Sequence, residues 1–147
     1  MQVRRLLPLS LSLVVVLWAF GVTAQPPTFK TEMFGGYVVG GGDSNGFGAA
    51  MLTVEKGADR ELFTINYIVQ AYKIAKPAAV HIHEGAPGQN GSIVATLKTI
   101  PSGDNAIDGV IATREIWGRR LFLSPNDFYI DVHTEQFPNG ALRGQFD

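Results

Sequence analysis

Short segments of this chain alternate apolar and polar residues, and glycine-rich turns separate them. The clearest is segment 62–72, in which Phe63, Ile65, Tyr67 and Val69 share one face of an extended backbone. A period of two is typical of a β-strand with one buried face. Similar segments lie at residues 34–39, 49–55, 79–84, 93–100, 110–113, 128–134 and 141–146. Because the sequence contains no convincing amphipathic helix, these segments predict an all-β fold, an antiparallel β-sandwich.

Three connections carry further information. Residues 135–140 contain proline and Asn-Gly, so they predict the turn of a hairpin between the last two strands. Residues 108–109, Asp-Gly, are typical of another tight turn. Residues 114–123 have apolar side chains at spacings that suit a short helix, but Gly118 weakens one. The pattern therefore leaves this last segment unassigned.

The N-terminus predicts export. Arg4 and Arg5 precede an apolar run and a small-residue cleavage site, so residues 1–24 are expected to be a signal peptide. A transmembrane anchor is the alternative, but the run is short and interrupted by polar residues and proline. Residues 25–32 then form a short tether, and residues 33–147 form one domain. The protein is expected to be secreted, periplasmic or extracellular, with no membrane span after cleavage.

Composition excludes several function classes. The formal net charge is -1, and no basic patch is present that could neutralise a nucleic-acid backbone. The chain has no cysteine, which rules out disulfides, thiolate metal sites and thiol catalysis. The His-Glu-x-x-His motif does not occur. Residues 42–46 read Gly-Asp-Ser-Asn-Gly, but they belong to a glycine-rich connection that no helix follows, so they do not predict the nucleophile elbow of a hydrolase. A complete catalytic set is thus not visible in the sequence, and a binding role is favoured.

All three histidines lie in two strand segments and share one pattern. His81 and His83 alternate with apolar residues in the first segment, as Asp131 and His133 do in the second. If the two strands are neighbours, three imidazoles and a carboxylate project from a common outward face. Imidazole suits copper and zinc, and three histidines can form a facial set for either metal. Water, Asp131, Glu84 or a substrate would then complete the coordination.

An alternative interpretation involves no metal. In the last strand Arg143 and Gln145 alternate with apolar residues, so they should share the outward face with Asp131. The histidines and these polar side chains could form a hydrogen-bonded network that fixes the strand register. In the loop before residue 92, Asn90 begins an Asn-Gly-Ser sequence that is either a glycosylation acceptor or a plain turn, and the turn is favoured.

Three blocks of the sequence resemble the CHRD domain, named for its repeats in chordin. They are residues 79–91, which read Ala-Val-His-Ile-His-Glu-Gly-Ala-Pro-Gly-Gln-Asn-Gly, residues 129–134, Tyr-Ile-Asp-Val-His-Thr, and residues 138–145, Pro-Asn-Gly-Ala-Leu-Arg-Gly-Gln. The resemblance implies a secreted or surface β-sandwich module of immunoglobulin-like or Greek-key type. The chain departs from the family pattern in having Glu84 where glycine is common, and Ala141-Leu142 where Gly-Glu is common.

A fainter similarity links the histidine strand to copper-zinc superoxide dismutases and implies a superoxide-dismutase-like sandwich. In that comparison His81, His83 and His133 match three copper ligands, whereas the bridging histidine and the zinc ligands have no counterpart. Two hypotheses follow. One is a non-enzymatic exported module that binds a protein or cell-surface partner or has a structural role. The other is a copper- or zinc-binding protein, with superoxide-dismutase-like redox chemistry as its furthest extension.

Overall fold

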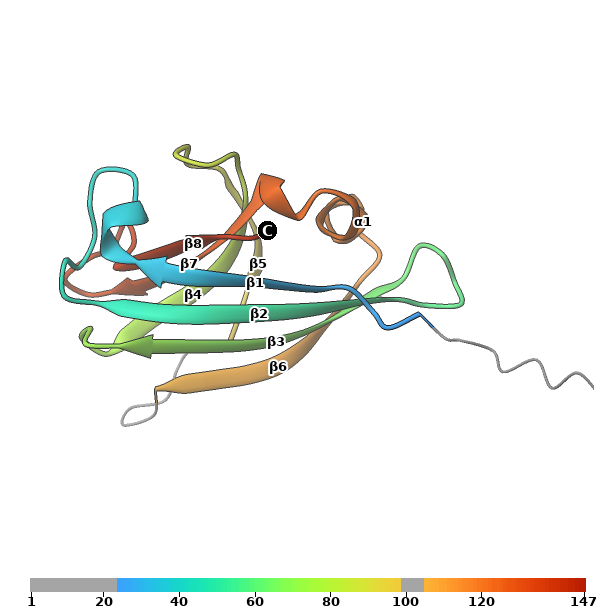
Figure 1. The fold of residues 1–147 in the computed structure, drawn as a ribbon, viewed down its shortest axis with the longest axis horizontal. Helices are drawn as coiled ribbons and strands as arrows, with labels where there is room; N and C mark the ends of the chain where they lie inside the picture. The colour runs from blue at the N-terminus through green and yellow to red at the C-terminus, as the bar shows by residue number, and fades with distance from the viewer. Residues whose placement is uncertain (1–23, 99–104) are drawn as a thin grey trace, which may run out of the picture.

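The computed structural model describes residues 24–98 and 105–147. Of the predicted signal peptide, residues 1–24, only Ala24 lies within this part. Within it, β-strands dominate, with one short α-helix and two 3-10 turns (Figure 1). The elements are β1 (Thr28–Phe34), η1 (Gly35–Tyr37), β2 (Phe47–Lys56), β3 (Phe63–Tyr72), β4 (Pro77–Glu84), β5 (Ser92–Thr96), β6 (Ala106–Thr113), α1 (Ile116–Leu123), η2 (Pro125–Asp127), β7 (Phe128–Thr134) and β8 (Leu142–Gln145). No helix in the described ranges is long and apolar enough to cross a membrane.

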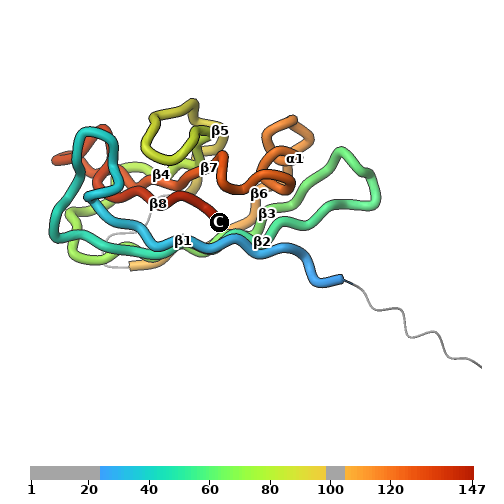
Figure 2. Tube along the Cα trace, turned by 45° about the horizontal axis from the view of Figure 1, so that its top comes forward, coloured from blue at the N-terminus to red at the C-terminus, as the bar shows by residue number. Residues whose placement is uncertain are grey.

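The strands form one curled antiparallel sheet. Its order is β5-β4-β7-β8-β1-β2-β3-β6, and the two halves face each other across the core (Figures 1 and 2). The halves join between β8 and β1, where a single residue pair, Phe34 with Arg143, is in register. The predicted all-β, sandwich-like fold is confirmed. The predicted hairpin is also present, because β7 and β8 pair antiparallel on either side of the turn.

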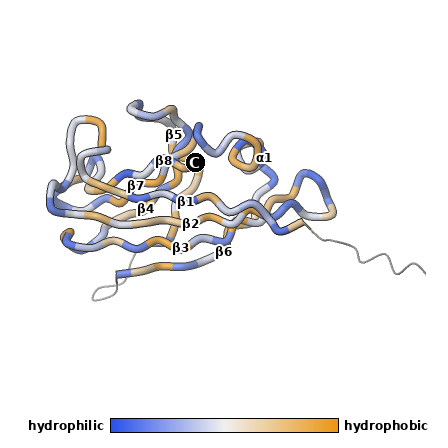
Figure 3. Tube along the Cα trace, viewed as in Figure 1, coloured by the Kyte–Doolittle hydropathy of each residue, from blue (hydrophilic) through white to orange (hydrophobic). Residues whose placement is uncertain are grey.

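The core forms where the apolar faces of the strands meet. Along β3 the predicted inward residues are buried, and the polar residues between them are more exposed. Figure 3 shows this alternation along the strands. The helix α1 adds Trp117 and Leu121 to the same core. β4, β7 and β8 contribute Val80, Ile82, Ile130, Val132 and Leu142. The apolar residues of β4 and β7 thus point into the core, as predicted.

Several element bounds differ from the sequence prediction. Regular structure begins at Thr28, within the predicted tether, and not near Met33. Residues 35–37 form a 3-10 turn where a strand was expected. The predicted turn at residues 108–109 is wrong, because both lie inside β6. Gly109 pairs with Tyr67, and a Cβ there would overlap the Tyr67 ring. Glycine therefore makes room for an aromatic side chain at this position.

The unassigned segment contains the helix. α1 begins at Ile116, and its Gly118 lies against Thr113 and Phe63, where a Cβ would crowd the Thr113 side chain. The glycine that weakens the helical propensity thus permits close packing on the sheet. The predicted strand 93–100 is shorter than expected: β5 ends at Thr96, and residues 99–100 lie outside the described part.

Candidate metal centre

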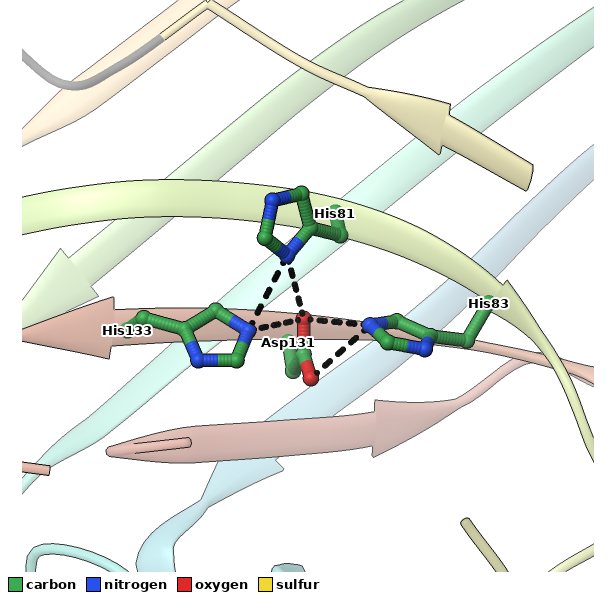
Figure 4. Close-up of side chains that lie close together, drawn as sticks. All are labelled: His81, His83, Asp131 and His133. Carbon is green, nitrogen blue, oxygen red and sulfur yellow. Dashed lines mark hydrogen bonds and ion pairs between the residues drawn. The ribbon is translucent and has the colours of Figure 1, made fainter. Parts of the chain in front are cut away.

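The pairing of β4 with β7 brings the predicted site residues together. His81 is the register partner of Asp131, and His133, two residues further along β7, is the partner of Ala79. Residues two apart on a strand point the same way, so His83 lies on the same outer face as His81. Figure 4 shows the four side chains converging from the two strands. The adjacency that the metal hypothesis required is therefore present.

Asp131 lies at the centre of the group (Figure 4). Its Oδ1 is 2.9 Å from His133 Nε2 and 3.1 Å from His83 Nε2. His81 faces the group with Nδ1, whereas the other two histidines face it with Nε2. His81 Nδ1 lies 3.1 Å from His133 Nε2 and 3.7 Å from Asp131 Oδ1. One potential ligand atom from each residue lies within 4.8 Å of all the others. The group offers three imidazole nitrogens and one carboxylate oxygen.

Backbone carbonyls hold two of the imidazole rings at the nitrogen that faces away from Asp131. His83 Nδ1 lies 3.0 Å from the carbonyl oxygen of Gly91, and His133 Nδ1 lies 2.9 Å from that of Pro138. A carbonyl oxygen can only accept, so each Nδ1 must carry the proton and donate it. Each Nε2 then faces the Asp131 carboxylate. A lone pair facing a carboxylate is favourable only when a proton or a metal cation stands between them.

The acidities of the group reflect this arrangement. Burial raises the pKa of Asp131, but its interactions with His133 and His83 outweigh this effect and hold that pKa below its ordinary value. The hydrogen bond to Asp131 raises the pKa of His133, although burial acts against it. Burial lowers the pKa of His81; the Asp131 charge opposes this, and the two other histidines reinforce it. Without metal, a proton therefore binds His133 more readily than His81.

The geometry suits a small divalent ion after a slight contraction. Zinc and copper bind imidazole nitrogen and carboxylate oxygen at about 2.0–2.2 Å, so ligand atoms around one ion lie at most about 4.4 Å apart. The candidate ligand atoms lie within 4.8 Å of each other. Closing the group onto an ion that has two ligands opposite one another thus needs a few tenths of an ångström, and closing it onto a tetrahedral ion needs about 1 Å more. A histidine whose second nitrogen donates to a carbonyl is also the usual arrangement around a bound metal.

The centre is covered by residues 85–91, which fold over the outer face as a loop. Arg143 Nη2 donates to the carbonyl of Ala86 at 3.2 Å, and Gln145 Nε2 donates to that of Gly85 at 2.9 Å. His83 and Asp131 are consequently only 7% and 6% exposed. The predicted outward face is present, but the loop buries much of it. Arg143 and Gln145 share that face, as predicted, although they bind the loop and not the histidines.

One predicted candidate ligand lies elsewhere. Glu84 forms an ion pair with Arg120 of α1 and does not join the four-residue group. Three contributors were not predicted: Tyr129 and the carbonyls of Gly91 and Pro138. Tyr129 lies two residues before Asp131 on the same strand, so the sequence could have predicted that both side chains are on one face of the sheet. Backbone carbonyls have no residue-specific signal and could not.

Comparison with known proteins identifies a family that matches most of the chain. The family described as CHRD domain has a sequence profile that matches residues 29–146. No curated protein and no solved structure matches significantly. The matched range spans every strand except the first residue of β1, and it includes all four residues of the candidate centre.

Proposed function

Because this chain belongs to the CHRD domain family, we propose that it is an exported binding module whose ligand is a copper or zinc ion. The ion would be held by His81, His83, His133 and Asp131. Glu84 is not part of the proposed set, since it pairs with Arg120. The function proposed is binding, and no reaction is assigned to it.

One observation carries the metal proposal: two backbone carbonyls hold the protons of His83 and His133 on the Nδ1 atoms. Both Nε2 atoms are thereby directed at one carboxylate oxygen. A register-fixing network would need only one protonated imidazole for this carboxylate. The group instead presents three nitrogens and an oxygen with matching separations, which is a donor set that copper and zinc prefer.

The experiment is isothermal titration of copper(II) and zinc into the metal-free exported protein. We expect one ion per chain, and a loss of at least about 100-fold in affinity for His83→Ala, since a ligand is removed. Glu84→Gln is the matched control: it lies next to His83 in the sequence but outside the centre, and it should bind like the unaltered protein. Absence of binding, or equal binding by His83→Ala, would refute the proposal.

Export rests on the N-terminal sequence. A positively charged start, an apolar run and a small-residue site are the features that a signal peptidase requires. We propose cleavage after Ala24, which places the module outside the cytoplasm. Mass spectrometry of the protein recovered from the producing cells tests this. A mature chain that starts at Gln25 supports the proposal, and an intact Met1 in a cytoplasmic fraction contradicts it.

A further inference from the structure

Tyr129 occupies an unusual place beside the candidate centre. It comes from β7, which lies between β4 and β8 in the sheet, and it is only 2% exposed. The His83 ring stacks on it with 4.6 Å between the ring centroids and 10° between the planes. The Arg143 guanidinium lies 3.5 Å from the ring centroid. Because His83 and Arg143 belong to strands on opposite sides of β7, they cover opposite faces of the ring.

The hydroxyl of the same tyrosine reaches His83 by a second route. It accepts a hydrogen bond of 3.1 Å from the backbone N–H of Gly91. The carbonyl of Gly91 in turn accepts the Nδ1 proton of His83. A Cβ at residue 91 would overlap the carbonyl of Glu84, so the loop passes directly against the end of β4. Tyr129 thus contacts the imidazole by its ring face and, through one glycine, by its hydroxyl.

Arg143 supports this arrangement and has no acidic partner among the ion pairs of the described residues. Its guanidinium donates to the Ala86 carbonyl and to the side chains of Asn90 and Gln145. Burial lowers the pKa of Arg143, which is the cost of placing a cation against a tyrosine ring and a loop. The contacts show that the arginine holds the ring and the loop together.

We propose that Tyr129 is a positioning residue for the metal centre. It fixes the plane of the His83 ring and keeps the imidazole proton on Nδ1, so that Nε2 is presented to the ion. An imidazole can turn about its Cβ–Cγ bond and can move its proton between its two nitrogens. The stacked ring restricts the first freedom, and the anchored Gly91 carbonyl restricts the second. This inference rests on the proposed metal function.

The test compares two substitutions that each remove one buried phenol hydroxyl. Tyr129→Phe keeps the stacked ring but releases Gly91. Tyr67→Phe is the matched control: Tyr67 is 6% exposed, and its hydroxyl accepts only a 3.4 Å bond from the Lys98 N–H. We expect Tyr129→Phe to weaken copper(II) and zinc binding about tenfold, as loss of a partner behind a ligand usually does. Tyr67→Phe should bind like the unaltered protein.

A second readout separates positioning from general loosening. In the metal-free protein, nitrogen-15 spectra of the imidazoles report which nitrogen of His83 carries the proton. We expect Nδ1 in the unaltered protein and in Tyr67→Phe, and a mixture in Tyr129→Phe. The copper(II) electron paramagnetic resonance spectrum should shift in Tyr129→Phe alone.

The outcomes distinguish the two proposals. If the unaltered protein binds no metal, the proposed function fails, while the nitrogen-15 spectra still decide whether Tyr129 positions His83. If metal binds and Tyr129→Phe matches the unaltered protein in affinity and proton position, the positioning role is overturned. Equal losses in both variants would also overturn it, because Tyr67 does not contact the centre.

Discussion

Replacement of Asp131 by asparagine in the metal-free protein removes one negative charge and preserves the shape of the side chain. The carboxylate lies 2.9 Å from His133 Nε2 and 3.1 Å from His83 Nε2, and it is buried. Asparagine stands in for the protonated carboxyl. The substitution therefore isolates what the charge contributes to stability, and that contribution must depend on pH.

The sign follows from two pKa shifts. The pKa of Asp131 lies below its ordinary value of 3.8 in the folded protein, so its contribution is present above about pH 3.8 and is lost as the pH falls through the folded pKa. The pKa of His133 lies above its ordinary value of 6.5. The His133 contribution is therefore complete below about pH 6.5 and is lost as the pH rises through the folded pKa. Both contributions are present between about pH 4 and 6.5.

The magnitude can be worked from the contacts. A hydrogen bond to a charged group contributes about 1.5–3 kcal/mol, and Asp131 accepts one from the protonated imidazole of His133. Asparagine keeps part of this bonding, so we expect a loss of about 2 kcal/mol in the free energy of unfolding within that window. For a domain of this size, 2 kcal/mol lowers the melting temperature by about 6–10 °C.

The assay is urea unfolding of the two metal-free proteins, followed by circular dichroism at intervals from pH 3 to pH 9. The difference in unfolding free energy should be largest between about pH 4 and 6.5 and should shrink on both sides. Val132→Ala, at the next position but facing the core, is the control, since its loss should not vary with pH. Parallel pH profiles for the unaltered protein and Asp131→Asn would refute the reasoning.

Three further predictions follow from single contacts. Metal binding should release a proton below about pH 6.5, because the raised pKa of His133 keeps its Nε2 proton in place there; titrations at pH 6 in buffers of different ionisation enthalpy measure the release, and buffer-independent heats would contradict it. Gly91→Ala should weaken metal binding by displacing the carbonyl behind His83, whereas Gly36→Ala, where a Cβ meets nothing, should not; equal affinities would argue against this role. Leu121→Ala should destabilise the protein by about 2–5 kcal/mol, since Leu121 is fully buried; a loss under 1 kcal/mol in urea unfolding would mean that α1 packs loosely.

The sequence predicts the common face of the four candidate residues because a period of two is a local property. The alternation of apolar and polar residues along β4 and β7 determines which side of the sheet each side chain is on. The outward direction of His81, His83, Asp131 and His133 can therefore be predicted without knowledge of the fold. The adjacency of the two strands is a different kind of fact. It depends on chain connections that no local pattern encodes, and the structure was needed to establish it.

The start of β1 shows the limit of the same rule. Its inward residues are Phe29, Thr31 and Met33, and the polar threonine interrupts the apolar series. Phe29 and Met33 are nevertheless buried, because pairing with β2 fixes the register. The sequence pattern also could not predict that His83 and Asp131 are buried. This burial results from the loop 85–91, whose backbone carbonyls bind side chains from another part of the chain.

The pairing of β4 with β7 also bears on the order in which the protein folds. β2 and β3 are joined by a short connection and can pair early, whereas His81 and His133 meet across 52 residues of sequence. Closing a loop of that length costs about 3.5 kcal/mol of chain entropy before any contact compensates it. The four candidate ligands should therefore assemble late. An ion that binds only the finished pair would leave the folding rate nearly unchanged and slow unfolding, so its occupancy would set the lifetime of the native state against proteases.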